Sequence, residues 1–370
     1  MQAQSQMSHK SPYKINLNIN LKAELPEDDA LYITGNLPEL GDWDPSGRKL
    51  VPETDGTYAL ELTASPGFIV ECKITRGSWK TQGIHNPDVV PPDNFVIKVN
   101  KNQNVQVNIV GWLDHRDMES DPVQGRLETS KTFACCGLKY KRPVEVWLPD
   151  NYDENGEPCA VIYMHDGQNL FEPAKAFAGI DWKVDETVSR LLASGELRQC
   201  IVVAIPNSPD RMKELNLYTK EGKAYAEFIV NEVKPWVEAH YNVSKQPQDN
   251  AIMGSSMGGL ISFQMLYAYE NSFGLAGCLS SAFQKTDGQV FEKIGNQGFI
   301  PLNARLYLDA GEFEPPIAQA YFAMMQLLKE KGFIEGYNLM GFFEEQATHS
   351  ETRWAGRLHL SLKFLLGKII

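Results

Sequence analysis

Strand-like and helix-like segments alternate from Leu138 to the end of the chain, and this alternation restricts the fold more than any other sequence feature. Short apolar runs are typical of buried strands, and longer segments with apolar residues three or four apart are typical of helices. The expected strands are 144–148, 160–164, 201–205, 251–253, 275–279, 306–309 and 339–343. The expected helices are 185–193, 223–240 (with a kink or restart at Pro235), 260–269, 316–331 and 354–366. Such alternation predicts an α/β fold with a doubly wound, mostly parallel sheet, whose ligands bind at the carboxyl ends of the strands.

The first third of the chain has a different pattern. Apolar and polar side chains alternate in three short segments, 13–21, 58–62 and 95–99. Clusters of Pro, Asp, Asn and Gly separate such runs, which predicts a smaller all-β sandwich over residues 13–112. Residues 1–12 read as a flexible tail. The charged, turn-rich stretch 113–137 reads as a linker to the second domain, 138–370.

Composition excludes several classes of protein. With 43% hydrophobic and 10% aromatic residues, the chain can bury two cores and is not disordered. A net charge of −12 without a basic patch argues against a nucleic-acid partner. No apolar run approaches the roughly 20 residues that span a bilayer, and residues 1–12 lack the apolar core of a signal peptide. We therefore expect no membrane association and a cytoplasmic location, or a periplasmic or secreted one if a signal has been removed.

The six cysteines are scattered along the chain. No C-x-x-C pair or Cys/His cluster has the spacing of metal ligands. We therefore expect reduced structural thiols and no metal site.

The motif GSSMGG at 254–259 lies between an expected strand and an expected helix. Strand, tight turn and helix is the setting in which G-x-S-x-G forms a nucleophile elbow, with the central Ser256 exposed on a strained turn. A serine hydroxyl is a weak nucleophile at neutral pH. Ser256 therefore needs a base, an orienting acid and donors for an oxyanion, but no cofactor.

The order of residues along the chain selects candidates for the base and the acid. In α/β sheets with this motif, the acid and then the base follow the serine. Only His349 and His359 follow Ser256. His359 lies within an amphipathic helix, whereas His349 lies in a polar loop after the last strand, so we predict that His349 is the base. For the acid, Glu314 is favoured over Asp309, because Asp309 falls at the strand end while Glu314 lies on the loop and can reach the imidazole Nδ1.

An oxyanion hole uses the N–H group after the nucleophile and a second N–H from the loop after an earlier strand. The first predicted donor is therefore Met257. The second is Gln168, with Gly167 as the alternative, because both follow a buried strand and glycine allows close backbone approach. His165 and Asp166 precede the serine, which indicates that they shape this loop and are not members of the triad.

Five motifs resemble one known family. They are YMHDGQNLF at 163–171, DWKVDE at 181–186, GSSMGG at 254–259, LDAGEFE at 308–314 and HSETRW at 349–354. Residues 138 to about 368 thus resemble the Putative esterase family of α/β-hydrolases, which includes enterochelin-type siderophore esterases and family-1 carbohydrate esterases. The resemblance implies a serine esterase that works through an acyl-enzyme, with Ser256 as nucleophile, His349 as base and Glu314 as acid. Aspartate is common at the acid position in feruloyl esterases, and this chain departs from that pattern.

The same resemblance implies substrate contacts for Asp166, Trp182 and Arg211. Instead of contacting substrate, Trp182 could be a core residue and Arg211 a surface ion-pair partner; both alternatives stay open. The implied substrate is a small ester or a polysaccharide-linked feruloyl or acetyl ester. The alternatives are a siderophore lactone esterase, and a glucan-binding protein whose hydrolase domain is vestigial.

The first domain resembles a second family. The segments LYITGNLPELGDWDP at 31–45 and ECKITRGSW at 71–79 are similar to family-20 starch-binding modules. In that family two tryptophans and a lysine bind glucan, and the matching residues here are Trp43, Lys73 and Trp79. Flat indole faces stack on sugar rings, and a lysine donates to hydroxyl groups. An α-glucan is therefore an expected partner, with a purely structural or substrate-gating domain as the alternative.

Overall fold

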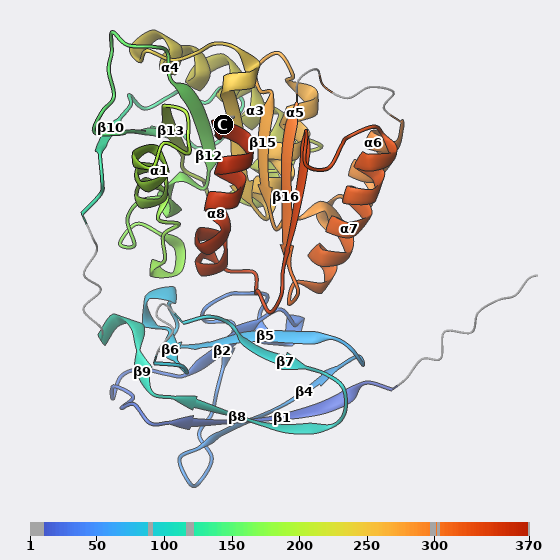
Figure 1. The fold of residues 1–370 in the computed structure, drawn as a ribbon. Coiled ribbons are helices and arrows are strands. Elements are labelled where there is room, and N and C mark those ends of the chain that lie inside the picture. The colour runs from blue at the N-terminus through green and yellow to red at the C-terminus, as the bar shows by residue number, and fades with distance from the viewer. Residues whose placement is uncertain (1–10, 88–91, 116–121, 297–300, 302–303, 369–370) are drawn as a thin grey trace, which may run out of the picture. The chain divides into compact units, whose positions relative to one another are not determined.

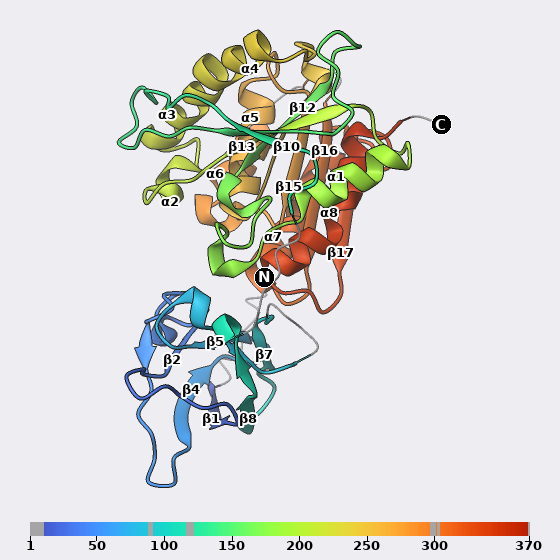
Figure 2. The same cartoon turned by 90° about the vertical axis from the view of Figure 1, so that its left-hand side faces the viewer.

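The computed structural model describes residues 11–87, 92–115, 122–296, 301 and 304–368. The chain divides into two compact units, residues 1–119 and 120–370, each with its own core. In Figures 1 and 2 the strands of the first unit are blue to teal, and the colour of the second unit runs from green to red along the chain.

The first unit is built from short strands. They are β1 (Tyr13–Leu21), β2 (Tyr32–Gly35), β3 (Arg48–Lys49), β4 (Tyr58–Ala64), β5 (Ile69–Thr75), β6 (Gly83–Ile84), β7 (Phe95–Lys98), β8 (Gln103–Ile109) and β9 (Gly111–Trp112). One sheet has the order β4-β1-β8, a second has the order β3-β2-β5-β7, and β6 pairs with β9. Alternation along β1 buries Ile15, Leu17 and Ile19 while their neighbours face solvent. The unit is therefore the β-rich domain that the alternating pattern predicted.

The second unit contains one eight-stranded sheet in the order β10-β11-β13-β12-β14-β15-β16-β17. Its strands are β10 (Arg126–Thr129), β11 (Glu145–Leu148), β12 (Ala160–His165), β13 (Cys200–Ile205), β14 (Asn250–Ser255), β15 (Leu275–Leu279), β16 (Arg305–Gly311) and β17 (Leu339–Glu344). The pairings of β10 with β11 and of β11 with β13 are antiparallel, and all other pairings in this sheet are parallel. The predicted doubly wound, mostly parallel sheet is thereby confirmed.

Helices cover both faces of this sheet. They are α1 (Val184–Ala193), α2 (Arg211–Glu214), α3 (Lys220–Phe228), α4 (Lys234–His240), α5 (Met257–Ala268), α6 (Gln289–Asn296), α7 (Pro315–Glu330) and α8 (Glu351–Leu366). Figures 1 and 2 show α1 and α8 together on one face, and α3, α4 and α5 on the other. Successive residues of the central strands enter two different cores: Tyr163 packs with the α3–α5 side, and Ile162 and Met164 pack with α1 and α8. Burial on both faces explains why these strands are continuous apolar runs.

The structure differs from the sequence prediction in three respects. Residues 126–129 lie inside the expected linker but form β10, the antiparallel edge of the large sheet. The segments α2 and α6 were not predicted, since both are short. The expected helix 223–240 is continuous but contains a π-helical turn, Ile229–Val233, directly before the helix that carries Pro235 near its start. A wider turn at this point accommodates a proline ring that would clash in a regular helix.

All six cysteines have free thiols in the structure, and Cys136 alone among them is exposed. Of the helices in the described part of the chain, none combines the length and the apolar character needed to cross a bilayer.

Candidate active site

The turn after β14 has the geometry of a nucleophile elbow. Ser256 has φ 55° and ψ −116°, a strained conformation for a residue with a side chain, and α5 begins at the next residue. A Cβ atom on Gly254 would lie 2.8 Å from the backbone of Gly258. Glycine at 254 is therefore required by the close approach of two backbone segments.

Residues 279–282, at the end of β15 and just beyond it, hold the peptide groups of Ser256 on both sides. The N–H of Ser256 donates to the carbonyl of Leu279 at 2.9 Å, and the N–H of Ala282 donates to the carbonyl of Ser256 at 2.9 Å. Two bonds from one short segment fix the strained backbone in place, which over-determines the conformation as such a turn requires.

His349 and Glu314 are paired. His349 lies in the loop between β17 and α8, and its Nδ1 is 2.9 Å from Oε1 of Glu314. The other oxygen of Glu314, Oε2, accepts hydrogen bonds from Oγ of Ser280 at 2.9 Å and from the N–H of Gly311 at 2.6 Å. The Glu314 side chain is fully buried, whereas 29% of the His349 side chain is exposed. The carboxylate is thus held in one orientation, and the imidazole remains accessible for chemistry.

Asp309 has different partners from Glu314. It lies within β16, and its carboxylate forms a bidentate ion pair with Arg357, at 2.8 Å to Nε and 3.0 Å to Nη2. Its Oδ1 also accepts the N–H of Ser280 at 2.7 Å. Burial alone would lower the pKa of Arg357, but Asp309 raises it, so the guanidinium stays protonated. Of the two carboxylates considered for the acid, Glu314 is the one that contacts His349.

Two elements carry the predicted backbone donors of the oxyanion hole. Met257 is the first residue of α5, so its N–H has no acceptor within the helix. Gly167 begins a 3₁₀ turn after β12, Gly167–Asn169, and a Cβ there would lie 2.6 Å from the backbone of β13. The side chain of Gln168 accepts the N–H of Asn207 at 3.1 Å, so it is engaged in holding the loop. The predicted oxyanion donor from this loop is a backbone N–H group, that of Gln168 or that of Gly167.

The buried Asp166 and the partly exposed Arg211 form an ion pair beside the elbow. Asp166 Oδ1 is 2.6 Å from Nε of Arg211, and Oδ2 is 2.7 Å from Nη2. Asn207 donates to the same carboxylate at 2.6 Å. Burial would raise the pKa of Asp166, but Arg211 and these hydrogen bonds lower it below its ordinary value. Arg211 is thus an ion-pair partner whose side chain, 26% exposed, still reaches the surface.

His165, the neighbour of Asp166, is completely buried. Its Nδ1 is 2.9 Å from the hydroxyl of Tyr225, and its Nε2 has no hydrogen-bond partner among the residues that the structure describes. Burial lowers the pKa of His165 to about 4, so the ring is neutral near pH 7. This histidine therefore packs the loop against α3.

Trp182 lies behind the His349 loop. Its side chain is 1% exposed and its ring contacts that of Trp354, with centroids 5.6 Å apart. Trp354 in turn meets the ring of His349 edge to face at 4.8 Å. Trp182 is thus part of the core that supports the wall behind His349.

The three residues matched to starch-binding modules lie in the first unit. Trp43 and Trp79 are half-buried, and the N–H of Trp43 donates to the carbonyl of Gly35 at 3.2 Å. Lys73 pairs with Thr34 in the β2–β5 ladder, and its Nζ donates to the carbonyl of Pro92. The lysine that the resemblance assigns to sugar hydroxyls is thus bonded to the backbone of its own domain.

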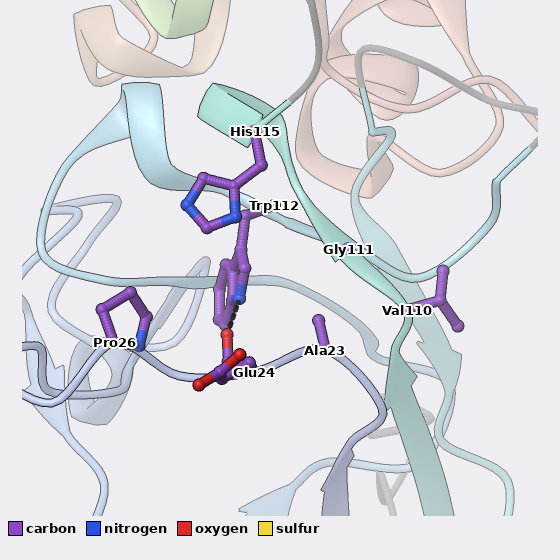
Figure 3. Close-up of a pocket in the computed structure, with 7 residues that line it drawn as sticks. All are labelled: Ala23, Glu24, Pro26, Val110, Gly111, Trp112 and His115. Carbon is purple, nitrogen blue, oxygen red and sulfur yellow. Dashed lines mark hydrogen bonds between the residues drawn. The ribbon is translucent and has the colours of Figure 1, made fainter.

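Two cavities stand out in the structure. The larger, about 460 Å³, lies in the first unit and is lined by Ala23, Glu24, Pro26, Val110, Gly111, Trp112 and His115 (Figure 3). The indole N–H of Trp112 donates to the carbonyl of Glu24 at 2.8 Å across this hollow. The second, about 300 Å³, lies between Tyr218, Phe263 and Lys293. Neither is lined by Ser256 or by the three matched residues Trp43, Lys73 and Trp79, and within the described residues no cluster of His, Cys, Asp and Glu has the make-up of a metal site.

Sequence analysis missed two residues that contact the Glu314 region, Ser280 and Arg357. Both are buried side chains, 0% and 2% exposed. Arg357 gave a signal, since an arginine on the otherwise apolar face of an amphipathic helix requires a carboxylate partner. Ser280 gave none, because a serine after a strand is typical of any turn.

Comparison with known proteins places this geometry in context. A family model with the description "Putative esterase" matches residues 137–365. The uncharacterized protein YbbA of Bacillus subtilis is 25% identical over 239 residues, which cover 61% of this chain and 93% of that protein.

Solved structures share the fold. The enterobactin esterase FES from Shigella flexneri superposes with a TM-score of 0.56 at 16% identity, covering 91% of this chain and 88% of that one. A ferulic acid esterase has a TM-score of 0.51 at 19% identity, covering 66% of this chain and 98% of its own. At these levels of sequence identity, the similarity shows a common fold and nothing more.

Proposed function

The chain belongs to the Putative esterase family, and from that membership we propose that it is a serine hydrolase of carboxylic esters that works through an acyl-enzyme. The observation that carries the proposal is the 2.9 Å contact between His349 Nδ1 and Glu314 Oε1. Glu314 lies on the loop after β16 and His349 on the loop after β17. Both loops are at the edge of the parallel sheet where Ser256 follows β14. Ligands of such sheets bind at this edge.

The proposed reaction begins with attack of Ser256 Oγ on the ester carbonyl carbon, while Nε2 of His349 takes the hydroxyl proton. The oxyanion accepts hydrogen bonds from the N–H of Met257 and from that of Gln168 or Gly167. Collapse of the tetrahedral intermediate expels the alcohol, which receives the proton from His349. Water then attacks the acyl-enzyme with His349 as base, and the acid is released as Ser256 regains its proton.

Glu314 has the role of orienting acid in this scheme. Its Oε1 accepts the Nδ1–H of His349, which leaves Nε2 as the basic nitrogen. Asp309 cannot take the same role while Arg357 engages both of its oxygens. Full burial of Glu314 also strengthens its attraction for the imidazolium that forms during each proton transfer.

The substrate we favour is a carbohydrate-linked ester, feruloyl or acetyl. Its support is the ferulic acid esterase fold and the half-buried Trp43 and Trp79 of the first unit. A siderophore lactone is the second candidate, supported by the FES structure, which spans both units of this chain. A panel that pairs methyl ferulate and acetylated xylan with enterobactin separates the two. The higher kcat/KM identifies the class.

The decisive test is hydrolysis of p-nitrophenyl acetate by the Ser256→Ala variant. We expect a loss of at least about 10⁴-fold in kcat, because the nucleophile is gone while the fold is kept. Ser189→Ala, a half-buried serine on α1, is the matched control and should keep its activity. Retained activity in Ser256→Ala would exclude the mechanism. Absence of fluorophosphonate labelling in the wild type would instead favour a vestigial hydrolase domain.

For the first unit we propose α-glucan binding through stacking on Trp43 and Trp79, next to Lys73, whose ammonium group already donates to the carbonyl of Pro92. Affinity electrophoresis in starch gels tests it, with Trp43→Ala and Trp79→Ala as variants. Each should migrate faster than the wild type, because stacking on an indole is worth on the order of 1 kcal/mol. Unchanged migration would leave the unit with a structural role.

A further inference from the structure

Ser280 is the first residue after β15 and has an unusual environment. It is completely buried and has φ 42°, in the left-handed region that a serine seldom occupies. Its N–H donates to Asp309 Oδ1 at 2.7 Å, which holds the backbone in this conformation. A strained, buried polar residue next to a reaction centre needs a reason that packing alone does not give.

The hydroxyl of Ser280 has a direction that its partners impose. Oγ lies 2.5 Å from Nη2 of Arg357 and 3.0 Å from Nε1 of Trp354, and both of these groups can only donate. The two lone pairs of Oγ are therefore occupied, and its single hydrogen must point to the remaining partner, Oε2 of Glu314 at 2.9 Å. Donation from a guanidinium also polarises the hydroxyl, which strengthens the bond that it makes to the carboxylate.

Arg357 is itself fixed, so this arrangement is rigid. Its Nε and Nη2 bind Asp309, and its Nη1 donates to Glu344 at 2.9 Å. Its side chain is only 3% exposed. The guanidinium that donates to Ser280 thus cannot turn away without breaking a buried ion pair.

The same short segment holds the nucleophile. The carbonyl of Leu279 and the N–H of Ala282, on either side of Ser280, bond to the N–H and the carbonyl of Ser256. Residues 279–282 therefore contact Ser256 through their backbone and Glu314 through the Ser280 side chain. This four-residue segment at the end of β15 therefore connects Ser256, which follows β14, with Glu314, which follows β16.

We propose that Ser280 is a positioning residue for ester hydrolysis, which fixes the Glu314–His349 pair in register with Ser256 through its hydroxyl. The inference rests on the proposed function, since it acts through Glu314. A hydrogen bond to a charged group, such as that from Ser280 to the Glu314 carboxylate, is typically worth about 10- to 100-fold. We expect that loss in kcat for Ser280→Ala, with little change in KM, because substrate binding does not involve this buried group.

A double-mutant cycle on the full-length chain tests the proposal, with kcat for p-nitrophenyl acetate measured for Ser280→Ala, Glu314→Ala and the double variant. If Ser280 acts through Glu314, its substitution should change kcat by less than about threefold in the Glu314→Ala background. Ser361→Ala, another completely buried serine, on α8, is the matched control, with a similar stability change and unaltered kcat. Ser280→Gly is the second variant, because glycine accepts φ 42° without strain and keeps the fold while removing the hydroxyl.

The possible outcomes distinguish failure of the Ser280 inference from failure of the proposed function. A 10- to 100-fold loss in the wild-type background that disappears without Glu314 supports the inference. An equal loss in both backgrounds, or full kcat in Ser280→Ala and Ser280→Gly, overturns it while leaving Ser256 as nucleophile. If Ser256→Ala itself retains activity, the proposed function fails first, and this inference fails with it.

Discussion

Two sides of the nucleophile elbow carry the same kinds of residue in different arrangements. On the side of β16 and β17, Glu314 binds His349, and the Asp309–Arg357 pair lies behind them. On the side of β12, Asp166 binds Arg211, and His165 lies beside it. Each side thus has a histidine, an arginine and at least one buried carboxylate.

The difference between the sides lies in which partner each carboxylate faces. Arg211 occupies both oxygens of Asp166, and His165 is fully buried against Tyr225. On the other side a second carboxylate, Asp309, satisfies the arginine, which leaves Glu314 to the partly exposed His349. Residue type alone therefore does not identify a base; an accessible imidazole with its own carboxylate does.

The largest expected effect is on the Glu314 side. Glu314→Gln should lower kcat by about 10⁴-fold, because an amide can hold His349 in the wrong tautomer. Steady-state hydrolysis of p-nitrophenyl acetate measures it, and Glu345→Gln, an exposed carboxylate on the same loop as His349, is the control. A similar loss in Asp166→Asn with none in Glu314→Gln would reverse the assignment of the two sides.

The two ion pairs should differ in stability. Arg357→Met leaves Asp309 buried without its charge partner and should lower the free energy of unfolding by about 3–5 kcal/mol. Arg211→Met should cost about 1–3 kcal/mol, since this arginine is 26% exposed and Asn207 still donates to Asp166. Urea denaturation followed by tryptophan fluorescence gives both values. Equal losses would show that burial of the arginine does not govern the strength of these pairs.

The buried His165 should make stability depend on pH. Its folded pKa of about 4 lies below the unfolded value of about 6.5, so the unfolded chain binds the proton more tightly. Above pH 6.5, His165 therefore does not change the free energy of unfolding. As the pH falls from 6.5 toward 4, His165 lowers the free energy of unfolding by about 3 kcal/mol in all. Unfolding free energies measured at pH 7.5, 5.5 and 4.5 should fall less steeply in His165→Asn than in the wild type. The same dependence of unfolding free energy on pH in both proteins would contradict a lowered pKa for His165. His359→Asn, on the surface of α8, is the control.

The smallest effect is expected for Gln168→Ala. If this loop donates through its backbone, removal of the side chain loses only the bond to Asn207 and should lower kcat by about two- to fivefold. A loss near 10³-fold, typical of a deleted oxyanion donor, would show that the side-chain amide participates directly. The ratio of kcat in the variant and the wild type decides between the two.

Local patterns predicted the fold well and the site unevenly. Apolar runs located the strands of the large sheet, and G-x-S-x-G located the turn at Ser256, because both depend on neighbours in sequence. The contact of Glu314 with His349 spans 35 residues, and that of Arg357 with Ser280 spans 77. Such pairings depend on strand order and side-chain direction, which one sequence does not specify. Even the choice between Glu314 and Asp309, five positions apart, rested on where β16 ends.

The helix that follows Ser256 gives the site a further property. In α5 the residues from Met257 to Leu266 are all buried, so the helix is enclosed by core on every side. Elements of this kind exchange their amide hydrogens mainly when the whole domain opens. The amides of Ile261 to Leu266 should therefore be among the slowest to exchange with deuterium. On heating, the nucleophile should keep its place until the domain unfolds, so that thermal inactivation and global unfolding coincide.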